Sequence, residues 1–433
     1  MKPKPRIVFL LLTDNDRANL PVAGLSRSGC DCAVLSPPGF TCARSRFVSQ
    51  HFQLPHHRGM WIGMLSVRTG LERVMRQWHP DLVVPLDDVG ASLLRGLAVG
   101  RLVSVELRRV LELSLGSPAG YDATCSRALL LALSTRIGVR GPRSRAVERT
   151  TALEAAADIG YPVVLKLEQT CGGCGVQIIR DPVQLRDAIV AAGYARWGSR
   201  MRCRAEARRF VWRLAGVRKT KTAFELQQFI SGVGAMHAVA TWQGRILAGV
   251  SFEKLCVDPQ PFGVPTVLRV IEHPEIDAAA RQIVAALGCS GFAHLDFVIE
   301  KDSGHAFFIE MNPHAPSEIH LGKLVGIDVC GAMARQLGGL TETTDAPTPG
   351  DQRPIALFPR ELARDPESTW LRAGSEVFHD VPWDDPEAFE TCYNRLLEKH
   401  PEHSAKIAGV LGMEDHAVGI SDEALASGRS AID

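Results

Sequence analysis

The sequence predicts an α/β protein whose first domain is built on a parallel sheet, and three observations lead to this fold class. Residues 6 to 115 alternate apolar runs of strand length with segments of helical apolar spacing, an order that favours parallel strands covered by helices. At 433 residues the chain is too long for one ordinary domain and predicts two or three. A hydrophobic content of 45% with 22% charged residues is that of an ordinary soluble globular protein.

Charge and cysteine content narrow the functional class and the compartment. A net charge of +1 provides no global attraction to nucleic acid or to an acidic membrane. The 11 cysteines show no zinc-like pairing, and a disulfide framework is not expected in so large a chain, so we expect reduced thiols and a cytoplasmic location. The run "IVFLLL" near the N-terminus is too short for a membrane span or a signal segment and predicts a buried first strand.

The first domain can be followed element by element. Strands are expected at 6–13, 30–37 and 81–88, and helices at 17–29, 64–80 and 89–100. No Gly-x-Gly-x-x-Gly follows the first strand, so a dinucleotide-binding fingerprint is missing.

The middle of the chain mixes helices with strands joined by glycine turns. Helices are expected at about 122–140, 150–160, 181–197, 275–288 and 327–339, and strands at 161–168, 176–180, 223–232, 234–255 and 291–312, where the last two ranges are hairpins. Thr151 and Glu154 have capping-box spacing at the start of the second helix. The composition of residues 341–353 predicts a linker. The tail from 354 to 433 is mixed, and its pattern gives the weakest indication of secondary structure.

The stretch "FFIEMNPHAPSEIH" at 307–320 carries the first chemical signal. Alternation along a strand places Glu310 and Asn312 on one face, and Pro313 ends the strand because it has no N–H to donate. Asp296 lies on the preceding strand of the same predicted hairpin, so the three side chains can converge. Carboxylate and amide oxygens suit Mg²⁺ together with nucleotide phosphates. A strand end that meets a polar loop explains the fragment equally well.

A second signal is "VVLKLEQTCGGCGVQII", a lysine-bearing strand followed by a glycine-rich turn and another strand. Glycines allow main-chain N–H groups to close over phosphates, and Lys166 would supply a point charge. A tight hairpin with a surface lysine is the alternative. The segment "LQQFISG" at 226–232 could present main-chain groups to a purine edge, although a plain linker strand explains it better on its own.

Taken in order, these stretches over roughly residues 6–340 resemble the ATP-grasp superfamily, to which carbamoyl phosphate synthetase large subunits and D-alanine–D-alanine ligases belong. The resemblance implies an ATP-grasp fold with a Rossmann-like parallel α/β domain at 1–115, an ATP-grasp domain at 116–340 with a lid at about 150–230, and a C-terminal extension at 341–433.

The resemblance also implies roles for individual residues. Lys166, Arg127 in place of the usual lysine, and the lid-loop glycines would bind the nucleotide phosphates. The hinge segment at 227–230 would contact the adenine, and three further side chains would bind Mg²⁺. The residues concerned are Arg127, Lys166, Gly172, Gly173, Gly175, Gln227, Gln228, Phe229 and Ile230 for ATP, and Asp296, Glu310 and Asn312 for Mg²⁺.

Two positions depart from the family pattern and bear on the substrate. Gly234 stands where the family usually has an acid for the ribose, and His314 stands where it usually has an arginine that faces the acceptor. Lys254, with Arg269 as second choice, would meet the transferred phosphate, although either could be an ordinary surface cation. Glu318, His320 and Lys323 either line the substrate pocket or flank the next helix.

The function implied is an ATP- and Mg²⁺-dependent ligase that joins a small-molecule carboxylate to an amine or other nucleophile through an acyl phosphate. A biotin-dependent carboxylase fits less well because no "MKM" carrier segment is present, and a carbamoyl phosphate synthetase would carry two such modules. Two alternatives stay open: a regulatory ATP-binding protein without ligase turnover, and a kinase that stops at a phosphorylated product.

A basic stretch at 196–221, "RWGSRMRCRAEARRFVWRLAGVRKTK", falls in the predicted lid. It is either a solvated loop or an element that meets an acidic partner or an anionic membrane surface. Nucleic acid is not expected, because no recognisable binding module is present. A homodimer formed through 341–433 is also left open.

Overall fold

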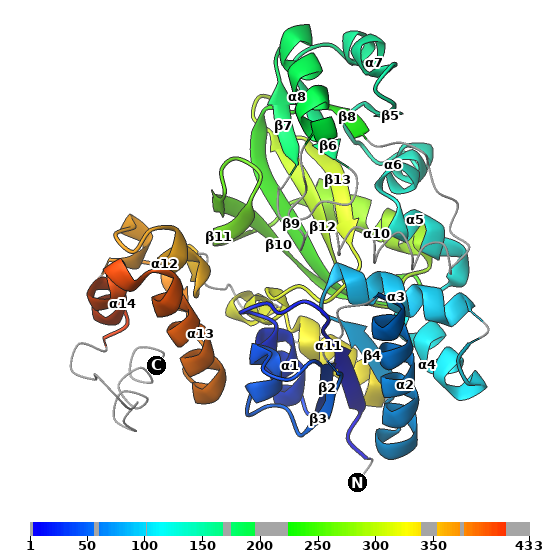
Figure 1. Ribbon diagram of the computed structural model, residues 1–433, viewed down its shortest axis with the longest axis vertical. Coiled ribbons are helices and arrows are strands. Elements are labelled where there is room, and N and C mark those ends of the chain that lie inside the picture. Colours follow the sequence, from blue (N-terminus) through cyan, green and yellow to red (C-terminus); the bar gives the residue numbers. More distant parts are fainter. Residues whose placement is uncertain are drawn as a thin grey trace.

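The computed structural model describes residues 3–55, 60–100, 102–167, 175–194, 224–338, 353–372 and 376–412. Within these ranges the chain forms three sheets, which succeed one another along the long axis of the molecule in Figure 1. We call them the N-terminal sheet, the central sheet and the lid sheet.

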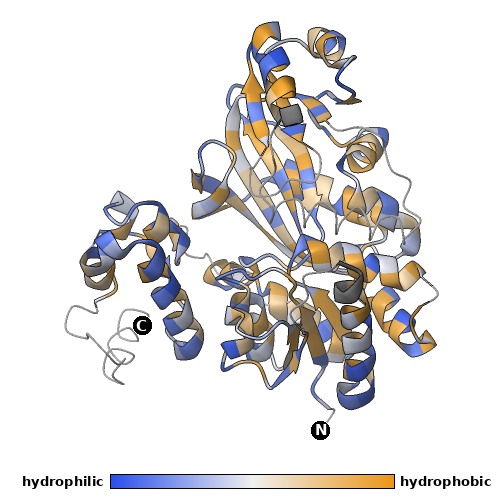
Figure 2. Ribbon diagram, in the orientation of Figure 1, coloured by the Kyte–Doolittle hydropathy of each residue, from blue (hydrophilic) through white to orange (hydrophobic). Residues whose placement is uncertain are grey.

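The N-terminal sheet is parallel, as the alternation of strands and helices predicts. Its strand order is β3-β2-β1-β4, and the strands in the middle are almost fully buried because helices pack on both faces. Figure 2 shows these strands in the hydrophobic colour. The elements are β1 (Arg6–Leu10), α1 (Asn19–Arg27), β2 (Asp31–Ser36), η1 (Thr41–Arg44), β3 (Gln50–Gln53), α2 (Met60–Trp78), β4 (Leu82–Pro85), α3 (Asp88–Val99) and α4 (Val105–Leu115).

The lid sheet is antiparallel, with strand order β5-β8-β6-β7, and stands at the top of Figure 1. Its apolar face packs against α7 and α8, whereas the alternate side chains, among them Lys166 and Glu225, point to the other face. The elements are β5 (Ser144–Val147), α7 (Ala152–Ile159), β6 (Val163–Leu167), β7 (Val176–Ile179), α8 (Pro182–Tyr194) and β8 (Phe224–Gln228).

The central sheet has the strand order β13-β12-β9-β10-β11-β14-β15 and is antiparallel except for its last pair. One face packs on α6 and α10, and the other packs towards α1 and α11. The predicted hairpins at 234–255 and 291–312 are both present. The elements are β9 (Gly232–Trp242), β10 (Arg245–Asp258), β11 (Val264–Ile271), α10 (Pro274–Leu287), β12 (Gly291–Glu300), β13 (Ala306–Asn312), η3 (Ile319–Val325) and α11 (Val329–Gly338).

Residues 353–372 and 376–412 do not form a detached unit. Strands β14 and β15 extend the central sheet, and the helices that follow enclose a small apolar core of their own. We keep the division at 115 and 340 as a proposal. The elements are β14 (Ile355–Leu357), α12 (Arg360–Arg364), η4 (Thr369–Leu371), β15 (Phe378–Asp380), α13 (Pro386–Lys399), η5 (Pro401–His403) and α14 (Ser404–Val410).

Two local predictions are wrong. The helix expected at about 122–140 is interrupted at Ser126, where the backbone is extended. The Ser126 side chain caps a new helix by accepting a hydrogen bond from the Leu129 amide. The two helices are α5 (Tyr121–Cys125) and α6 (Arg127–Arg136), preceded by η2 (Pro118–Gly120). The capping box at Thr151 is absent, because that residue already has helical dihedrals and its hydroxyl donates to the Glu148 carbonyl.

Within the described ranges, no helix combines the length and the apolar character needed to cross a bilayer. The cysteines of these ranges are free thiols, and most are buried. The glycine-rich loop at 168–174 and the basic stretch at 196–221 lie outside the described residues.

Candidate active site

Strands β12 and β13 bring the three predicted metal ligands together. Asp296 lies directly opposite Glu310 in the strand register, and His294 lies opposite Asn312. The Asn312 amide nitrogen is 3.1 Å from Asp296 Oδ2 and 2.8 Å from His294 Nε2. Residues directly opposite in a sheet share one face, so this edge of the central sheet presents two carboxylates and an amide together.

Each carboxylate contacts a cation that comes from another element. Lys254 on β10 places Nζ 2.6 Å from Asp296 Oδ1. Arg127, the first residue of α6, donates to Glu310 Oε2 from Nε at 2.9 Å and lies 2.8 Å from the same oxygen through Nη2. Because the helical break at Ser126 starts a new helix at Arg127, the Arg127 side chain lies where it can contact Glu310 on β13.

The surrounding charges keep both carboxyl groups ionised. Burial would raise the pKa of Asp296, but Lys254 and His294 together bring that pKa well below its usual range. Burial acts in the same direction on Glu310, and the charges of Arg127 and Lys166 more than compensate, so the pKa of Glu310 is also lowered. Ionised carboxylates are the form that binds a divalent cation.

Lys166 faces this group from the lid sheet. It is buried, and on β6 it lies directly opposite Glu225 of β8. Burial and the nearby Arg127 lower the pKa of Lys166, whereas Glu310 and Glu225 act to raise it. Charged side chains of the lid sheet thus lie close to those of the central sheet, with both signs present on each.

The hinge segment, Gln227 to Ile230, continues β8 away from Lys166. The Gln228 amide donates to the Arg143 carbonyl and the Phe229 amide to the Pro162 carbonyl, so both donors are used within the protein. Gln227 shares the face of Glu225, and its buried amide nitrogen has no hydrogen-bond partner among the described residues. A ligand acceptor would satisfy this nitrogen.

The structure places the other predicted residues in three different situations. Gly175 closes the β6–β7 turn, with a φ of 77° and its carbonyl accepting from Leu167, while Gly172 and Gly173 lie outside the described residues. Arg269 is not brought to the site. It is half-exposed and pairs with Glu253, and because Glu253 and Lys254 are successive residues of β10, Arg269 lies on the opposite face of the sheet.

His314 lies beside the metal strands and contacts the N-terminal part of the chain. Its Nε2 is 3.8 Å from Asp88 Oδ1 at the start of α3, and its ring packs edge-on to His294 at 5.7 Å between centroids. Burial lowers the pKa of His314, with Asp88 acting in the opposite direction. A neutral imidazole cannot replace the fixed charge of an arginine, but it can donate a hydrogen bond.

Beyond His314, the segment after β13 belongs to a buried ionic cluster that the sequence does not predict. Glu318 contacts Arg360 at 3.0 Å and Arg17 at 3.8 Å, and Asp380 contacts Arg17 at 2.6 Å and His320 at 2.9 Å. Glu318 and His320 are therefore engaged in this cluster, and the Glu318 side chain makes no capping hydrogen bond to η3. Lys323 is half-exposed and pairs with Asp328, away from this cluster.

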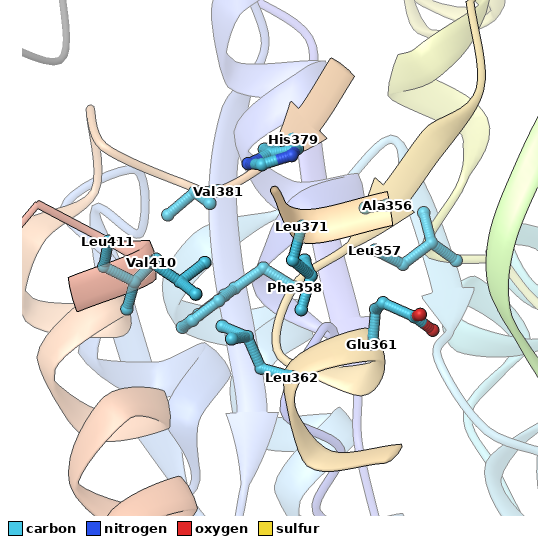
Figure 3. A pocket seen from close by; sticks show the side chains of 10 residues that line it. All are labelled: Ala356, Leu357, Phe358, Glu361, Leu362, Leu371, His379, Val381, Val410 and Leu411. Atoms are coloured by element: carbon cyan, nitrogen blue, oxygen red, sulfur yellow. The ribbon is translucent and has the colours of Figure 1, made fainter. Parts of the chain in front are cut away.

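A small cavity lies elsewhere, among the helices of the C-terminal extension. Figure 3 shows His379 and Val381 on one side of it, Glu361 and Leu362 on another, and Val410 beside Leu411. Its volume of about 10 Å³ is barely enough to hold one water molecule, so it is no substrate site.

Sequence reasoning missed Glu225 and His294. A lone carboxylate inside a strand and a histidine two places before Asp296 carry no motif. The alternation of side chains along β8 could have pointed to Glu225, since it shares a face with Gln227. Among the described residues no group of three or more His, Cys, Asp or Glu side chains is arranged as a metal site. The predicted site instead combines two carboxylates with the Asn312 amide.

Comparisons with known proteins relate part of the chain to an ATP-binding domain. Residues 127–200 match the model of the family described as "Carbamoyl-phosphate synthase L chain, ATP binding domain". The carbamoyl phosphate synthase large chain of Thermotoga neapolitana is 25% identical over 247 residues, which are 56% of this chain and 21% of that protein. The chain thus spans about a fifth of the length of that relative.

Two solved structures show the same fold at low sequence identity. The biotin carboxylase–β,γ-ATP complex from Campylobacter jejuni aligns with a TM-score of 0.56 at 13% identity, covering 79% of this chain and 72% of that one. The L-amino acid ligase from Bacillus licheniformis aligns with a TM-score of 0.51 at 16% identity, covering 78% and 75%.

The three sheets, with Lys166 on the lid sheet and the carboxylates on β12 and β13, form an ATP-grasp fold. The fold predicted from the sequence is therefore confirmed. Residues 127–200 are similar to an ATP-binding domain, and the chain as a whole shares its fold with these solved structures.

Proposed function

We propose that the chain is an ATP- and Mg²⁺-dependent ligase that joins a small-molecule carboxylate to an amine or related nucleophile and releases ADP and phosphate. The observation that carries this proposal is the convergence of Arg127, Lys166 and Lys254 on the carboxylate pair Asp296 and Glu310. Phosphoryl transfer needs cations at the phosphates and anions that hold the metal, and little else from the protein.

The nucleotide would lie between the lid sheet and the central sheet. Lys166 and Arg127 would neutralise its phosphates, and the buried Gln227 amide nitrogen would find an acceptor on the base. Because the Gln228 and Phe229 amides already donate within the protein, we expect the Ile230 amide to be the main-chain donor that the hinge offers to the base.

The residues present fit a magnesium ion. Asp296 and Glu310 are ionised oxygen donors opposite one another, and Asn312, whose amide nitrogen faces Asp296 here, would turn its amide to add an oxygen. These three would hold the ion, and phosphate oxygens would complete its shell. When bound, Mg²⁺ would offset the negative charge of the phosphates during transfer.

The chemistry follows from the poor leaving group of a carboxylate. An oxygen of the substrate carboxylate attacks the γ-phosphorus, the bond to the bridging oxygen breaks, and ADP leaves. The amine then attacks the acyl carbon, the C–O bond to phosphate breaks, and the amine loses a proton. Lys254 would stabilise the transferred phosphoryl group, and the neutral His314 would donate a hydrogen bond to the acceptor.

A substrate screen tests the activity. The purified chain is incubated with ATP, Mg²⁺ and a matrix of carboxylates and amines, and ADP and phosphate release are measured. We expect release that requires both an acid and an amine, and hydroxylamine should trap the acyl phosphate when the amine is withheld. Phosphorylated product that hydroxylamine does not trap would identify a kinase, and nucleotide binding without turnover would identify a regulatory protein.

Matched variants test the assignment of residues. Lys166→Ala and Glu310→Ala should each abolish ADP release while the melting temperature stays near that of the unmodified protein. Lys301→Ala removes an exposed lysine at the turn of the β12–β13 hairpin and should leave release unchanged. Normal turnover in either of the first two variants would refute the assignment.

The cytoplasmic location expected from the sequence stays a prediction, and so does the homodimer.

A further inference from the structure

We infer that Glu225 is a positioning residue that holds Arg127 and Lys166 for the nucleotide phosphates and links the lid sheet to Glu310 on the central sheet. The inference rests on the proposed nucleotide binding and goes beyond it, because none of the motifs that predict the site includes Glu225.

The geometry places Glu225 between the two phosphate-binding cations. It is 2% exposed in the middle of β8 and lies directly opposite Lys166 on β6, so both side chains occupy the same face of the lid sheet. Its Oε2 is 3.8 Å from Arg127 Nη1. A carboxylate this deeply buried is tolerated in a fold only when cations accompany it.

The fork of the Arg127 guanidinium joins two sheets. Its Nε and Nη2 face Glu310 Oε2 on β13, while its Nη1 faces Glu225 Oε2 on β8. A lysine at position 127 would be a single point charge and could not face both carboxylates in this way. The structure thus pairs an arginine at this position with a second acid on the lid.

Charge balance gives the second reason for Glu225. Arg127 and Lys166 carry the same charge and disfavour one another in a buried site. Glu310 offsets this repulsion from the central sheet, and it is also a predicted metal ligand. Glu225, which is not a predicted metal ligand, provides a negative charge on the lid side. The two cations can therefore stay close to each other before the phosphates bind.

Binding of Mg²⁺-ADP to the full chain, measured by titration calorimetry, tests the inference. The variants are Glu225→Gln, Arg127→Lys and the double variant, and Glu253→Gln is the control because it removes an ion pair on the opposite face of the central sheet. We expect each single variant to weaken binding by about tenfold, and the double variant to weaken it by clearly less than the product of the two single effects, since the Arg127–Glu225 contact is already lost in each single variant. The control should bind as the unmodified protein does.

Melting temperatures and a conservative variant keep the result decisive. A residue that only supports the fold would lower the melting temperature, and its effect on binding would be independent of Arg127→Lys. If Glu225→Gln does not fold, Glu225→Asp replaces it, and weakened binding at a near-normal melting temperature is expected. Unchanged binding in a folded Glu225 variant, or additive losses in the double variant, would overturn the inference alone. Absence of binding in the unmodified protein would overturn the proposed function as well.

Discussion

Lys254 reaches Asp296 by passing over Gly234. The two residues belong to β10 and β12, which are separated by β9, yet Nζ of the lysine is 2.6 Å from Oδ1 of the aspartate. A Cβ at position 234 on β9 would stand 3.2 Å from Lys254 Cδ and 3.8 Å from its Cβ and Cγ. The absence of a side chain at this position, a departure from the family pattern, therefore gives the lysine its path to the aspartate.

A side chain at position 234 should uncouple activity from stability. Gly234→Val is expected to displace Lys254 and to lower the rate of ADP release by about tenfold to a hundredfold, since one charged contact to the transferred group is lost. The strand preference of valine, worth up to about 1 kcal/mol, should offset part of the stability lost with the Lys254–Asp296 pair, so the free energy of unfolding should fall by no more than about 1 kcal/mol. Steady-state kinetics and urea unfolding measure the two effects. Val233→Ala, on the opposite face of β9, is the control, and an unaltered rate in folded Gly234→Val would contradict the prediction.

Removing the lysine should change how stability depends on pH. The pKa of Asp296 in the folded protein lies below its unfolded value of about 4, so the ionised group contributes stability above that pH and loses it as pH falls towards the depressed pKa. Lys254→Met should cost about 2 kcal/mol at pH 7, and the cost should shrink as pH falls below about 4. Urea unfolding at pH 7 and pH 3 measures the difference.

The control for this prediction is Arg269→Met, which breaks a half-exposed ion pair with Glu253. Solvent screening should limit its cost to less than about 1 kcal/mol. A cost of Lys254→Met that is equal at both pH values would show that the lysine acts through packing rather than through its charge.

A buried histidine on the other face of the central sheet predicts a second pH effect. Burial lowers the pKa of His237 to about 4, and its Nδ1 lies 2.8 Å from Ser251 Oγ. The neutral ring is favoured in the folded state, so its contribution is complete above the unfolded pKa of about 6.5 and is lost as pH falls towards 4. The free energy of unfolding should fall by about 3 kcal/mol over this interval. His237→Asn should flatten that part of the pH profile, and an equally steep profile in the variant would assign the effect to other groups.

Local patterns in the sequence predict the parts of the site that depend on neighbouring residues. Glu310 and Asn312 are two places apart on a strand, and the turn of their hairpin brings Asp296 opposite, so alternation alone places these three. Alternation cannot show that Lys254 passes over Gly234, because this depends on the order of strands in the sheet. The Arg17–Asp380 pair joins residues 363 positions apart, and no local pattern carries such a contact.

That long-range pair makes the C-terminal extension a part of the fold, and its removal should be costly. Arg17 is 1% exposed, and its Nη2 contacts Asp380 Oδ2 at 2.6 Å while its Nη1 donates to the Phe358 carbonyl. Arg17→Met would leave Asp380 with His320 as its neighbour and should lower the free energy of unfolding by about 3 kcal/mol, because a buried charge loses its partner. Arg145→Met, which breaks an exposed pair on the lid sheet, should cost less than about 1 kcal/mol in the same urea experiment. Equal costs for the two variants would mean that the buried cluster contributes no more than a surface ion pair, and that strand pairing and packing suffice to attach the C-terminal elements to the rest of the chain.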